Sequence, residues 1–375
     1  MTEALSSSDG TLLQYTRRVG SHAFRSALAD FLAEGGSTPK RPDEETLMVT
    51  NGVSHGLALA CAHLVPAGRV ALLADPTYFL ARNIVEQAGL VARALPPPAD
   101  GQGLAAAFAA ACDAVEAETG AQPALLYVVP TFCNPTAECV SADERQKLVE
   151  AARGRGVLLV SDDVYQMLSF PGEANVPPPP LRSFDAGGRT VVSLGSFSKY
   201  LAPGLRLGWV EAHPDLLTQL TDDGVIVSGG CVNPLASAAV EKALRSGAAR
   251  QHLDGTRREL AERCAALTEA LARHEGELWE THCPPRGGYF LWLRLLGGVE
   301  APRLASQAVA HQVKFCAGPR CAADDASKGR WEQYVRLCFA MHTPDEMREG
   351  VARLVAALKA YDPTVEVGAE MGHDR

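Results

Sequence analysis

The sequence lacks the features that mark membrane proteins, secreted proteins and metal-binding modules. No apolar run reaches the roughly 18 residues that a membrane-spanning helix needs, and the first twenty residues have no apolar core of a secretion signal. The ten cysteines include no C-x-x-C pair, and the ten histidines include no H-E-x-x-H motif. These absences argue against a disulfide scaffold and a structural metal, and they predict a reduced, cytoplasmic protein without a membrane anchor.

Positive charge is also scarce. Lysine and arginine contribute 35 residues against 44 aspartates and glutamates, so the formal net charge is −9. An acidic balance of this size gives no footprint for nucleic acid or for an anionic membrane surface. Hydrophobic residues make up 47% and charged residues 21% of the 375 residues, which is the balance of an ordinary enzyme and excludes wholesale disorder.

Apolar, β-branched runs alternate with helical periods between residues 46 and 240. This alternation predicts an α/β domain whose mostly parallel sheet is covered by helices on both faces. The expected strands span residues 46–50, 69–74, 90–95, 124–129, 157–161, 190–194 and 205–210. The expected crossover helices span residues 54–64, 77–88, 104–118 and 141–153, and the proline run 177–180 predicts a stiff, solvent-exposed loop.

The pattern after residue 240 differs and predicts a smaller α+β domain. A long charged helix is expected over residues 249–274, followed by short strands around residues 286–292, a helix over 301–311, a strand over 334–339 and a final helix over 345–358. We therefore expect an N-terminal arm and helix (1–35), a large cofactor-binding domain (36–245), a linking helix with the small domain (246–362) and a tail (363–375).

The most informative stretch runs from Ser196 to Trp209 with the sequence SFSKYLAPGLRLGW, directly after an apolar strand. Open α/β sheets bind ligands at such strand ends. The hydroxyls of Ser196 and Ser198 and the guanidinium of Arg206 suit a phosphate, and the amine of Lys199 condenses with an aldehyde to give a Schiff base. Together these groups predict a phosphorylated cofactor that carries an aldehyde.

With these residues in register, the sequence resembles the class I/II aminotransferases, pyridoxal-phosphate (PLP) enzymes of fold type I, and looks closest to the branch of the aminoadipate and kynurenine aminotransferases. The resemblance extends from about Gln14 to Leu358. It implies transfer of an amino group from an L-amino acid to a 2-oxo acid through a Lys199 aldimine, with Ser196, Ser198 and Arg206 as phosphate ligands. It also implies a homodimer with shared active sites.

Other segments match the same family. In Ser161-Asp162-Asp163-Val164-Tyr165, the family spacing selects Asp162 as the carboxylate that keeps the pyridine nitrogen protonated, and Tyr165 as the partner of the ring oxygen. We interpret Asp163 as a helix N-cap. The Asn-Pro-Thr motif that begins at Asn134 resembles the family Asn-Pro-Thr-Gly, which implies that Asn134 shares the ring oxygen and borders the substrate.

A strand-to-helix turn contains Gly52, Val53 and Ser54, whose backbone N–H groups suit a phosphate at a helix start. The resemblance makes Tyr78 the aromatic residue that stacks on the cofactor ring, and it leaves Phe79 for the core. The remaining two likenesses concern Tyr15, which resembles a tyrosine that reaches the phosphate of the neighbouring subunit, and Arg336, which resembles the arginine that grips the substrate α-carboxylate.

Two other functions stay open from the sequence. A fold type I enzyme with another outcome, such as a C–S lyase, racemase, decarboxylase or synthase, would keep the same cofactor residues, and a vestigial PLP-binding protein would keep the fold. Only thirteen residues precede Gln14, so we expect no winged-helix module there and less closure over the substrate. The substrate side chain is not specified, because Arg25, Arg182 and Arg320 each suit a distal carboxylate.

Overall fold

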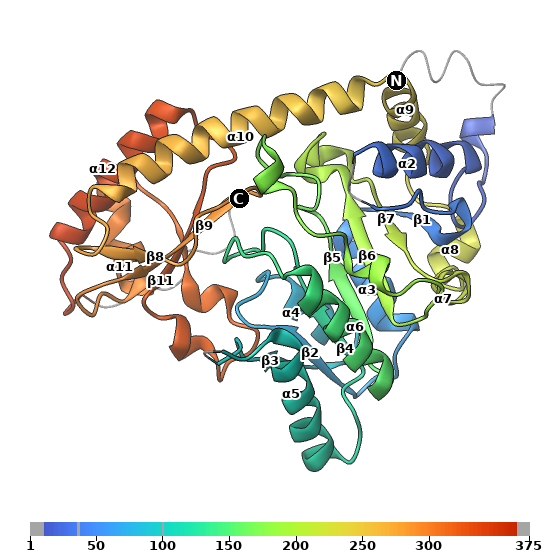
Figure 1. The fold of residues 1–375 in the computed structure, drawn as a ribbon, viewed down its shortest axis with the longest axis horizontal. Helices are drawn as coiled ribbons and strands as arrows, with labels where there is room; N and C mark the ends of the chain where they lie inside the picture. Colours follow the sequence, from blue (N-terminus) through green and yellow to red (C-terminus); the bar gives the residue numbers. More distant parts are fainter. Residues whose placement is uncertain (1–10, 36–37, 100, 366–375) are drawn as a thin grey trace.

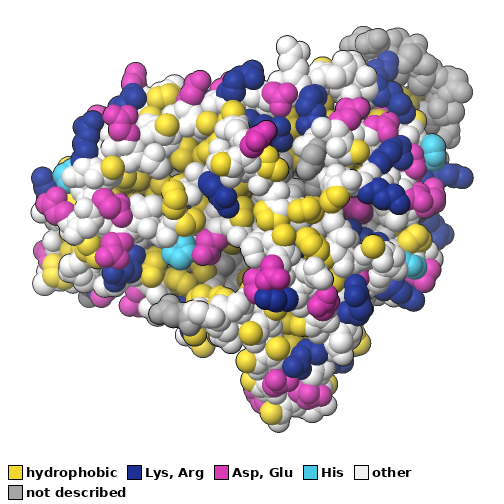
Figure 2. Space-filling model, viewed as in Figure 1, with side chains coloured by type: hydrophobic (Ala, Val, Ile, Leu, Met, Phe, Trp, Pro, Cys, Tyr) yellow, Lys and Arg dark blue, Asp and Glu magenta, His cyan; other side chains and the backbone are white. Residues whose placement is uncertain are grey.

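The computed structural model describes residues 11–35, 38–99 and 101–365. These residues form a large part around one sheet and a smaller part around a second sheet, and the long helix α10 (Ala248–Ala272) runs along both (Figure 1). On the face shown in Figure 2, Lys and Arg side chains alternate with Asp and Glu side chains, and no large area carries one sign of charge. Among the described residues, no helix is long and apolar enough to cross a membrane.

The large sheet contains seven strands in the order β1-β7-β6-β5-β4-β2-β3. Strands β3, β2, β4, β5 and β6 are parallel, whereas β7 is antiparallel to both β6 and β1, so β1 points the same way as β6. The strands are β1 (Leu47–Thr50), β2 (Val70–Ala74), β3 (Val91–Leu95), β4 (Leu125–Val128), β5 (Leu158–Asp162), β6 (Val191–Ser196) and β7 (Gly208–Glu211).

Helices cover both faces of this sheet, as the apolar strands predicted. Along β4, Leu125 and Tyr127 belong to one hydrophobic core, and Leu126 and Val128 belong to another on the opposite face. The first core contains side chains of α2 (His22–Glu34), α3 (Val53–His63) and α4 (Ala81–Gln87), and the second contains side chains of α5 (Leu104–Thr119) and α6 (Ala142–Arg155). The expected α/β architecture is therefore confirmed.

The smaller part contains an antiparallel sheet of four strands in the order β10-β11-β9-β8. Its elements are β8 (Trp279–Thr281), β9 (Phe290–Leu295), α11 (Ala301–Ala308), β10 (Cys316–Ala317), β11 (Tyr334–Cys338) and α12 (Pro344–Lys359). The remaining helices are α7 (Pro214–Leu220), α8 (Gly224–Gly229) and α9 (Pro234–Arg245), and short 3-10 helices include η1 (Thr11–Leu13), η2 (Glu44–Thr46), η4 (Leu181–Phe184), η6 (Pro203–Leu205) and η8 (Gly318–Cys321).

Three local expectations were wrong. The helix expected over 77–88 begins only at Ala81, because residues 75–80 form a turn held by contacts to the small part. The strand expected over 205–210 begins only at Gly208, because Arg206 is in the left-handed conformation with φ of 45°. The proline run is not an exposed loop, since Pro180 is buried and the Pro179 carbonyl accepts a hydrogen bond from buried Arg145 at 2.8 Å.

Candidate active site

The residues singled out by the motifs gather at one edge of the large sheet. Gly52 follows β1, Asn134 follows β4, Asp162 ends β5 and Ser196 ends β6. Because these four strands point the same way, their carboxyl ends meet at the same edge, which is where open α/β sheets bind ligands.

A cradle for an anion forms around the start of α3. Gly52 is the N-cap of this helix and no side chain caps it, so its first N–H groups stay open to a ligand. A Cβ placed on Gly52 would lie 3.1 Å from Nη2 of Arg206 and 3.8 Å from Oγ of Ser196. Ser196 is buried and its Oγ lies 2.9 Å from Oγ of Ser198. The start of α3, the guanidinium of Arg206 and the hydroxyls of Ser196 and Ser198 therefore surround the same small region.

Arg206 is held in its strained conformation by a residue that the motifs did not reveal. The side-chain amide of Asn233 donates to the backbone carbonyls of Leu205, at 2.7 Å, and of Arg206, at 2.6 Å. The guanidinium in turn donates from Nη2 to the carbonyl of Asn51 at 3.2 Å. These contacts compensate for a backbone conformation that L-residues rarely adopt and aim the side chain at the cradle.

Lys199 lies in the turn between β6 and β7. Burial lowers the pKa of its amine, against an opposing effect from the nearby carboxylate of Asp162. Nζ lies 5.6 Å from the ring centroid of Tyr289, and the Tyr289 hydroxyl donates to the Lys199 carbonyl. A partly buried amine whose pKa is lowered is better suited than an exposed lysine to act as a nucleophile and as a base.

Asp162 and Asp163 are oriented in opposite directions from the end of β5. The Asp162 carboxylate accepts from the Tyr127 hydroxyl at 2.6 Å and from the Val164 N–H at 3.2 Å, whereas Asp163 accepts from the hydroxyls of Ser161, at 2.8 Å, and of Ser193. Burial raises the pKa of each carboxyl to about 6. No helix begins at Asp163, so the N-cap interpretation was wrong and this residue serves the interior of the fold.

Asn134 and Arg336 come from different parts of the molecule and meet in the site. Nη1 of Arg336 donates to Oδ1 of Asn134 at 2.8 Å, and Nε of Arg336 is buried with no partner. The guanidinium lies over the ring of Phe290, with Cζ 4.2 Å from its centroid. Buried Tyr165 packs against the same Phe290 ring, at 5.9 Å between centroids. The site is thus shared between the two sheets.

Tyr78 and Phe79 border this region, and Tyr15 does not. The Tyr78 hydroxyl hydrogen-bonds to the side chain of Ser54. Burial raises the pKa of Tyr78, and the negative charge of Asp162 raises it further. Phe79 is only half-buried and has the guanidinium of Arg336 over its ring, so assigning it to the core was wrong. Tyr15 is 85% exposed, and within this chain it contributes nothing to the cradle.

The small part is fixed to the site through Asp75, which the motifs also did not reveal as important. Its buried carboxylate accepts from the Ala323 N–H at 3.0 Å, from Trp331 Nε1 at 3.1 Å and from the Ser327 hydroxyl at 3.2 Å. The sequence around Asp75 did not predict this role, because the hydrogen-bond partners of its carboxylate lie some 250 residues away along the chain.

The observed groups fit pyridoxal phosphate. The uncapped helix start, Ser196, Ser198 and Arg206 provide donors for a phosphate, and the buried Asp162 carboxylate needs a cation that a protonated pyridine supplies. The partly buried amine of Lys199 completes the set. The structure therefore agrees with the cofactor that the sequence predicted.

The chain belongs to the family described as aminotransferase class I and II, whose model matches residues 1–354. Members of this family use pyridoxal phosphate, and this protein is a PLP-dependent aminotransferase with the fold type I architecture. The predicted family, fold, cofactor and activity are thereby confirmed, and a different PLP reaction or a vestigial binding role is not favoured.

The chain is 31% identical over 350 residues to the 2-aminoadipate transaminase of Thermus thermophilus, covering 92% of this chain and 82% of that protein. The solved α-aminoadipate aminotransferase LysN from Thermus thermophilus, complexed with N-(5′-phosphopyridoxyl)-L-leucine, superposes with a TM-score of 0.79 at 29% identity over 96% of this chain and 87% of that one. An uncharacterised HTH-type transcriptional regulator of Bacillus subtilis, YdfD, is 26% identical over 92% of this chain and 67% of that protein.

Proposed function

We propose that the residues at the carboxyl edge of the large sheet bind pyridoxal phosphate and that Lys199 carries out the proton transfer of transamination. The observation that carries this proposal is the partly buried amine of Lys199, whose pKa is influenced by the buried carboxylate of Asp162, next to an anion cradle. We take residues 36–245 as the cofactor-binding domain and residues 246–362 as the linking helix and small domain, since α9 ends at Arg245 and α10 begins at Ala248.

Each side of the cofactor has its own set of residues in this proposal. The phosphate is held by Ser196, Ser198, Arg206 and the N–H groups of Gly52, Val53 and Ser54. Asp162 pairs with the pyridine nitrogen, and the Tyr127 hydroxyl keeps that carboxylate in place. Tyr165 and Asn134 would hydrogen-bond the ring oxygen, and Tyr78 would lie against the ring.

The chemistry divides between cofactor and protein. When bound, the cofactor supplies an aldehyde that condenses with amines and a protonated ring that draws electron density from the substrate α-carbon. Lys199 Nζ would hold the cofactor through its aldehyde. Its free amine would accept the proton from the substrate α-carbon and would donate it to the cofactor carbon that bears the aldehyde. The lowered pKa of Lys199 favours the neutral amine that this role requires.

Substrate is oriented by Arg336 and Asn134. Nη1 of Arg336 is engaged by Asn134, while the buried Nε has no partner and stays available for a second hydrogen bond. A guanidinium with such a free edge suits the α-carboxylate of an amino acid or a 2-oxo acid. Held by its carboxylate, the substrate presents its α-hydrogen toward Nζ of Lys199.

We further propose a homodimer in the cytoplasm. Large apolar side chains are exposed on the N-terminal segment and on helices α8 and α9, namely Leu13, Tyr15, Val225, Val227 and Leu235. The two regions are joined by the Cys231 N–H, which donates to Thr16 Oγ1 at 3.1 Å. Such an apolar surface is typical of an interface between subunits, and it carries Tyr15 toward a neighbouring phosphate site. The ten free cysteines favour a reducing compartment.

An amino-donor screen of the PLP-loaded protein, with 2-oxoglutarate and pyruvate as acceptors, tests this function. We expect the 2-oxo acid derived from the donor to form in equal amount with the new amino acid derived from the acceptor. Lys199→Ala should abolish this exchange, whereas Lys147→Ala, at an exposed lysine paired with Asp143, should leave it unchanged. Release of ammonia or carbon dioxide in place of the exchange would contradict transamination.

A further inference from the structure

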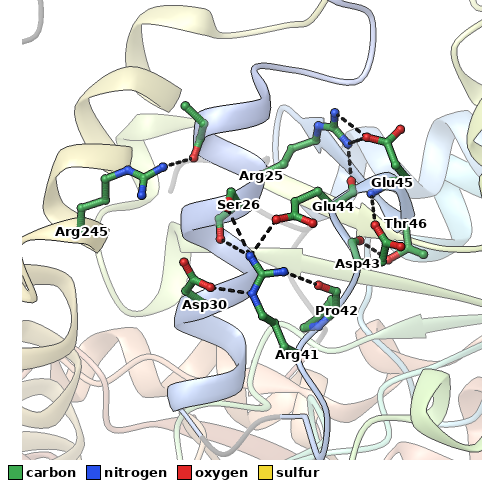
Figure 3. Close-up of polar contacts among 11 residues, drawn as sticks. Arg25, Ser26, Asp30, Arg41, Pro42, Asp43, Glu44, Glu45, Thr46 and Arg245 are labelled. Carbon is green, nitrogen blue, oxygen red and sulfur yellow. Dashed lines mark hydrogen bonds and ion pairs between the residues drawn. The ribbon is translucent and has the colours of Figure 1, made fainter.

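The structure separates the three arginines that the sequence left open for a distal carboxylate. Arg25 is buried and donates to the Glu44 carbonyl and, at 3.3 Å, to the carboxylate of Glu45, in the network between α2 and η2 (Figure 3). Arg182 is buried in η4, where Nη1 donates to the Asp185 carbonyl at 3.0 Å. Both guanidinium groups therefore already bind partners within the fold, which leaves them unsuited to a substrate carboxylate.

Arg182 is also at the wrong end of the sheet. The carboxylate of Asp185 that pairs with it accepts the N–H of Val191 at 2.9 Å, and Val191 is the first residue of β6. Lys199 follows the opposite end of the same strand. Arg182 thus lies at the amino edge of the sheet and the site lies at the carboxyl edge.

Arg320 differs from both in being exposed and beside the site. Its Cζ lies 5.3 Å from the ring centroid of Phe79, and Cζ of Arg336 lies 5.6 Å from the same centroid. Within the described part of the chain, no carboxylate forms a salt bridge with Arg320. Two guanidinium groups thus lie near one aromatic ring, and the Arg320 group is paired with no carboxylate of the described residues.

The turn that carries Arg320 is held firmly against the turn that carries Phe79. The Thr77 N–H donates to the Cys321 carbonyl at 2.7 Å, and the Ala323 N–H donates to the buried carboxylate of Asp75 at 3.0 Å. These contacts hold the backbone next to Arg320, which keeps the base of its side chain beside the turn that carries Phe79.

A neighbouring thiol lies close enough to both arginines to be affected by their charges. Cys316 lies directly across from Arg336 in the β10–β11 pair. The pKa of the Cys316 thiol is lowered, first by its hydrogen bond with Cys321 and then by the charges of Arg336 and Arg320. The two arginines therefore act on the same point, and a ligand with two negative groups would neutralise both.

We propose that Arg320 determines specificity by binding the side-chain carboxylate of a dicarboxylic amino acid or 2-oxo acid, while Arg336 holds the α-carboxylate. This inference rests on the proposed role of Arg336. The Phe79 ring, which both guanidinium groups approach, provides an apolar surface for the methylene groups that separate the two carboxylates.

The test compares two amino donors of equal length, L-2-aminoadipate and L-norleucine, which differ only in a terminal carboxylate or methyl group. The PLP-loaded protein is assayed as wild type, Arg320→Gln, Arg320→Lys and, as a matched exposed arginine of the small part, Arg348→Gln. We expect Arg320→Gln to lower the ratio of kcat/KM for aminoadipate to that for norleucine at least about tenfold, mainly through KM, because a hydrogen-bonded charge pair is lost. Arg320→Lys should recover part of the ratio, and Arg348→Gln should leave it unchanged.

A binding measurement separates this inference from the proposed function. Calorimetric titration of the same proteins with adipate and with hexanoate should show weaker adipate binding in Arg320→Gln and little change for hexanoate. If no donor is transaminated but the binding of adipate still depends on Arg320, the proposed function fails and the second carboxylate site stands. The assignment of Arg320 would be overturned if the wild type did not prefer the dicarboxylates. It would also be overturned if Arg320→Gln weakened aminoadipate and norleucine, and adipate and hexanoate, to the same extent.

Discussion

Asparagine at position 162 or at position 163 removes one negative charge from the same strand end, and the structure predicts opposite outcomes for the two changes. Asp162 is buried and Asp163 is partly buried, and desolvation raises the pKa of both carboxyls to about 6. Of the two, only Asp162 has a pKa that is affected by the charge of Lys199, and only the Asp162 carboxylate accepts a hydrogen bond from the Tyr127 hydroxyl. Asp163 instead lines a small cavity with Ser193, Gln166 and Glu211.

The magnitude follows from the loss of a charge pair in a dry site. A buried cation that loses its only counter-charge costs several kcal/mol, and a hundredfold loss of rate corresponds to about 2.7 kcal/mol of barrier. Asp162→Asn should therefore lower the rate of the half-reaction by at least about a hundredfold. The cofactor should stay bound, because the change leaves untouched Ser196, Ser198 and Arg206, which we propose hold its phosphate.

Asp163→Asn should keep the rate within about threefold. An asparagine oxygen still accepts from Ser161, so the expected cost is one weakened hydrogen bond, about 1 kcal/mol of stability. The assay is a single-turnover mixing experiment in which the cofactor absorbance is followed after addition of the amino acid, with bound PLP quantified in each protein. Equal rates for the two variants, or the reverse order, would refute the orientation derived for this strand end.

Three further predictions concern Lys199, the dimer and the pH dependence of stability. Borohydride reduction of the loaded protein should leave the pyridoxyl group on the peptide that contains Lys199, and its recovery on another lysine would contradict the assignment. Sedimentation should show a dimer, Tyr15→Phe should weaken PLP binding without changing that state, and full activity in a monomer would exclude the shared site. Because burial raises the pKa of Asp163 from its ordinary value of about 3.9 to about 6, this carboxyl stabilises the fold most below about pH 4, and that contribution, on the order of 3 kcal/mol, is lost as the pH rises through 6. The Tm of Asp163→Asn relative to wild type should therefore increase from about pH 4 to about pH 7. A relative Tm that stays constant would show that ionisation costs the fold nothing, and one that falls would show that the fold favours the charged form, so either result would contradict the raised pKa.

The sequence was sufficient for the parts of the site that depend on short motifs at strand ends. In a parallel sheet the carboxyl ends of neighbouring strands lie together, so recognising the strands before Asn134, Asp162 and Lys199 already predicts that these residues gather. Local chemistry predicted the anion site. The helix start after Gly52 is uncapped and the turn before Lys199 is rich in hydroxyls, and both features suit the binding of an anion.

The sequence was not sufficient for contacts between residues far apart in the chain. Tyr127 and Asp162 are 35 residues apart, and Asn134 and Arg336 are 202 residues apart. Nothing in the local pattern around Tyr127 distinguishes a core tyrosine from one that orients a carboxylate. The same reason explains the misplaced strand before Gly208, because the conformation of Arg206 depends on the amide of Asn233.

The distance from Arg336 and Arg320, which we propose bind carboxylates, to Lys199 depends on how the small part is attached to the large sheet. Arg336 and Arg320 belong to the small part, whereas Lys199 follows β6 of the large sheet. Beside Phe79 the attachment is polar, since the buried carboxylate of Asp75 collects hydrogen bonds from the backbone and side chains of residues 323–331. Hydrogen bonds are directional, whereas apolar packing tolerates sliding, so this carboxylate fixes the distance between the arginines and the lysine more closely than an apolar contact would. A substrate of defined length requires such a fixed distance, which links the burial of Asp75 to the selection of dicarboxylates inferred for Arg320.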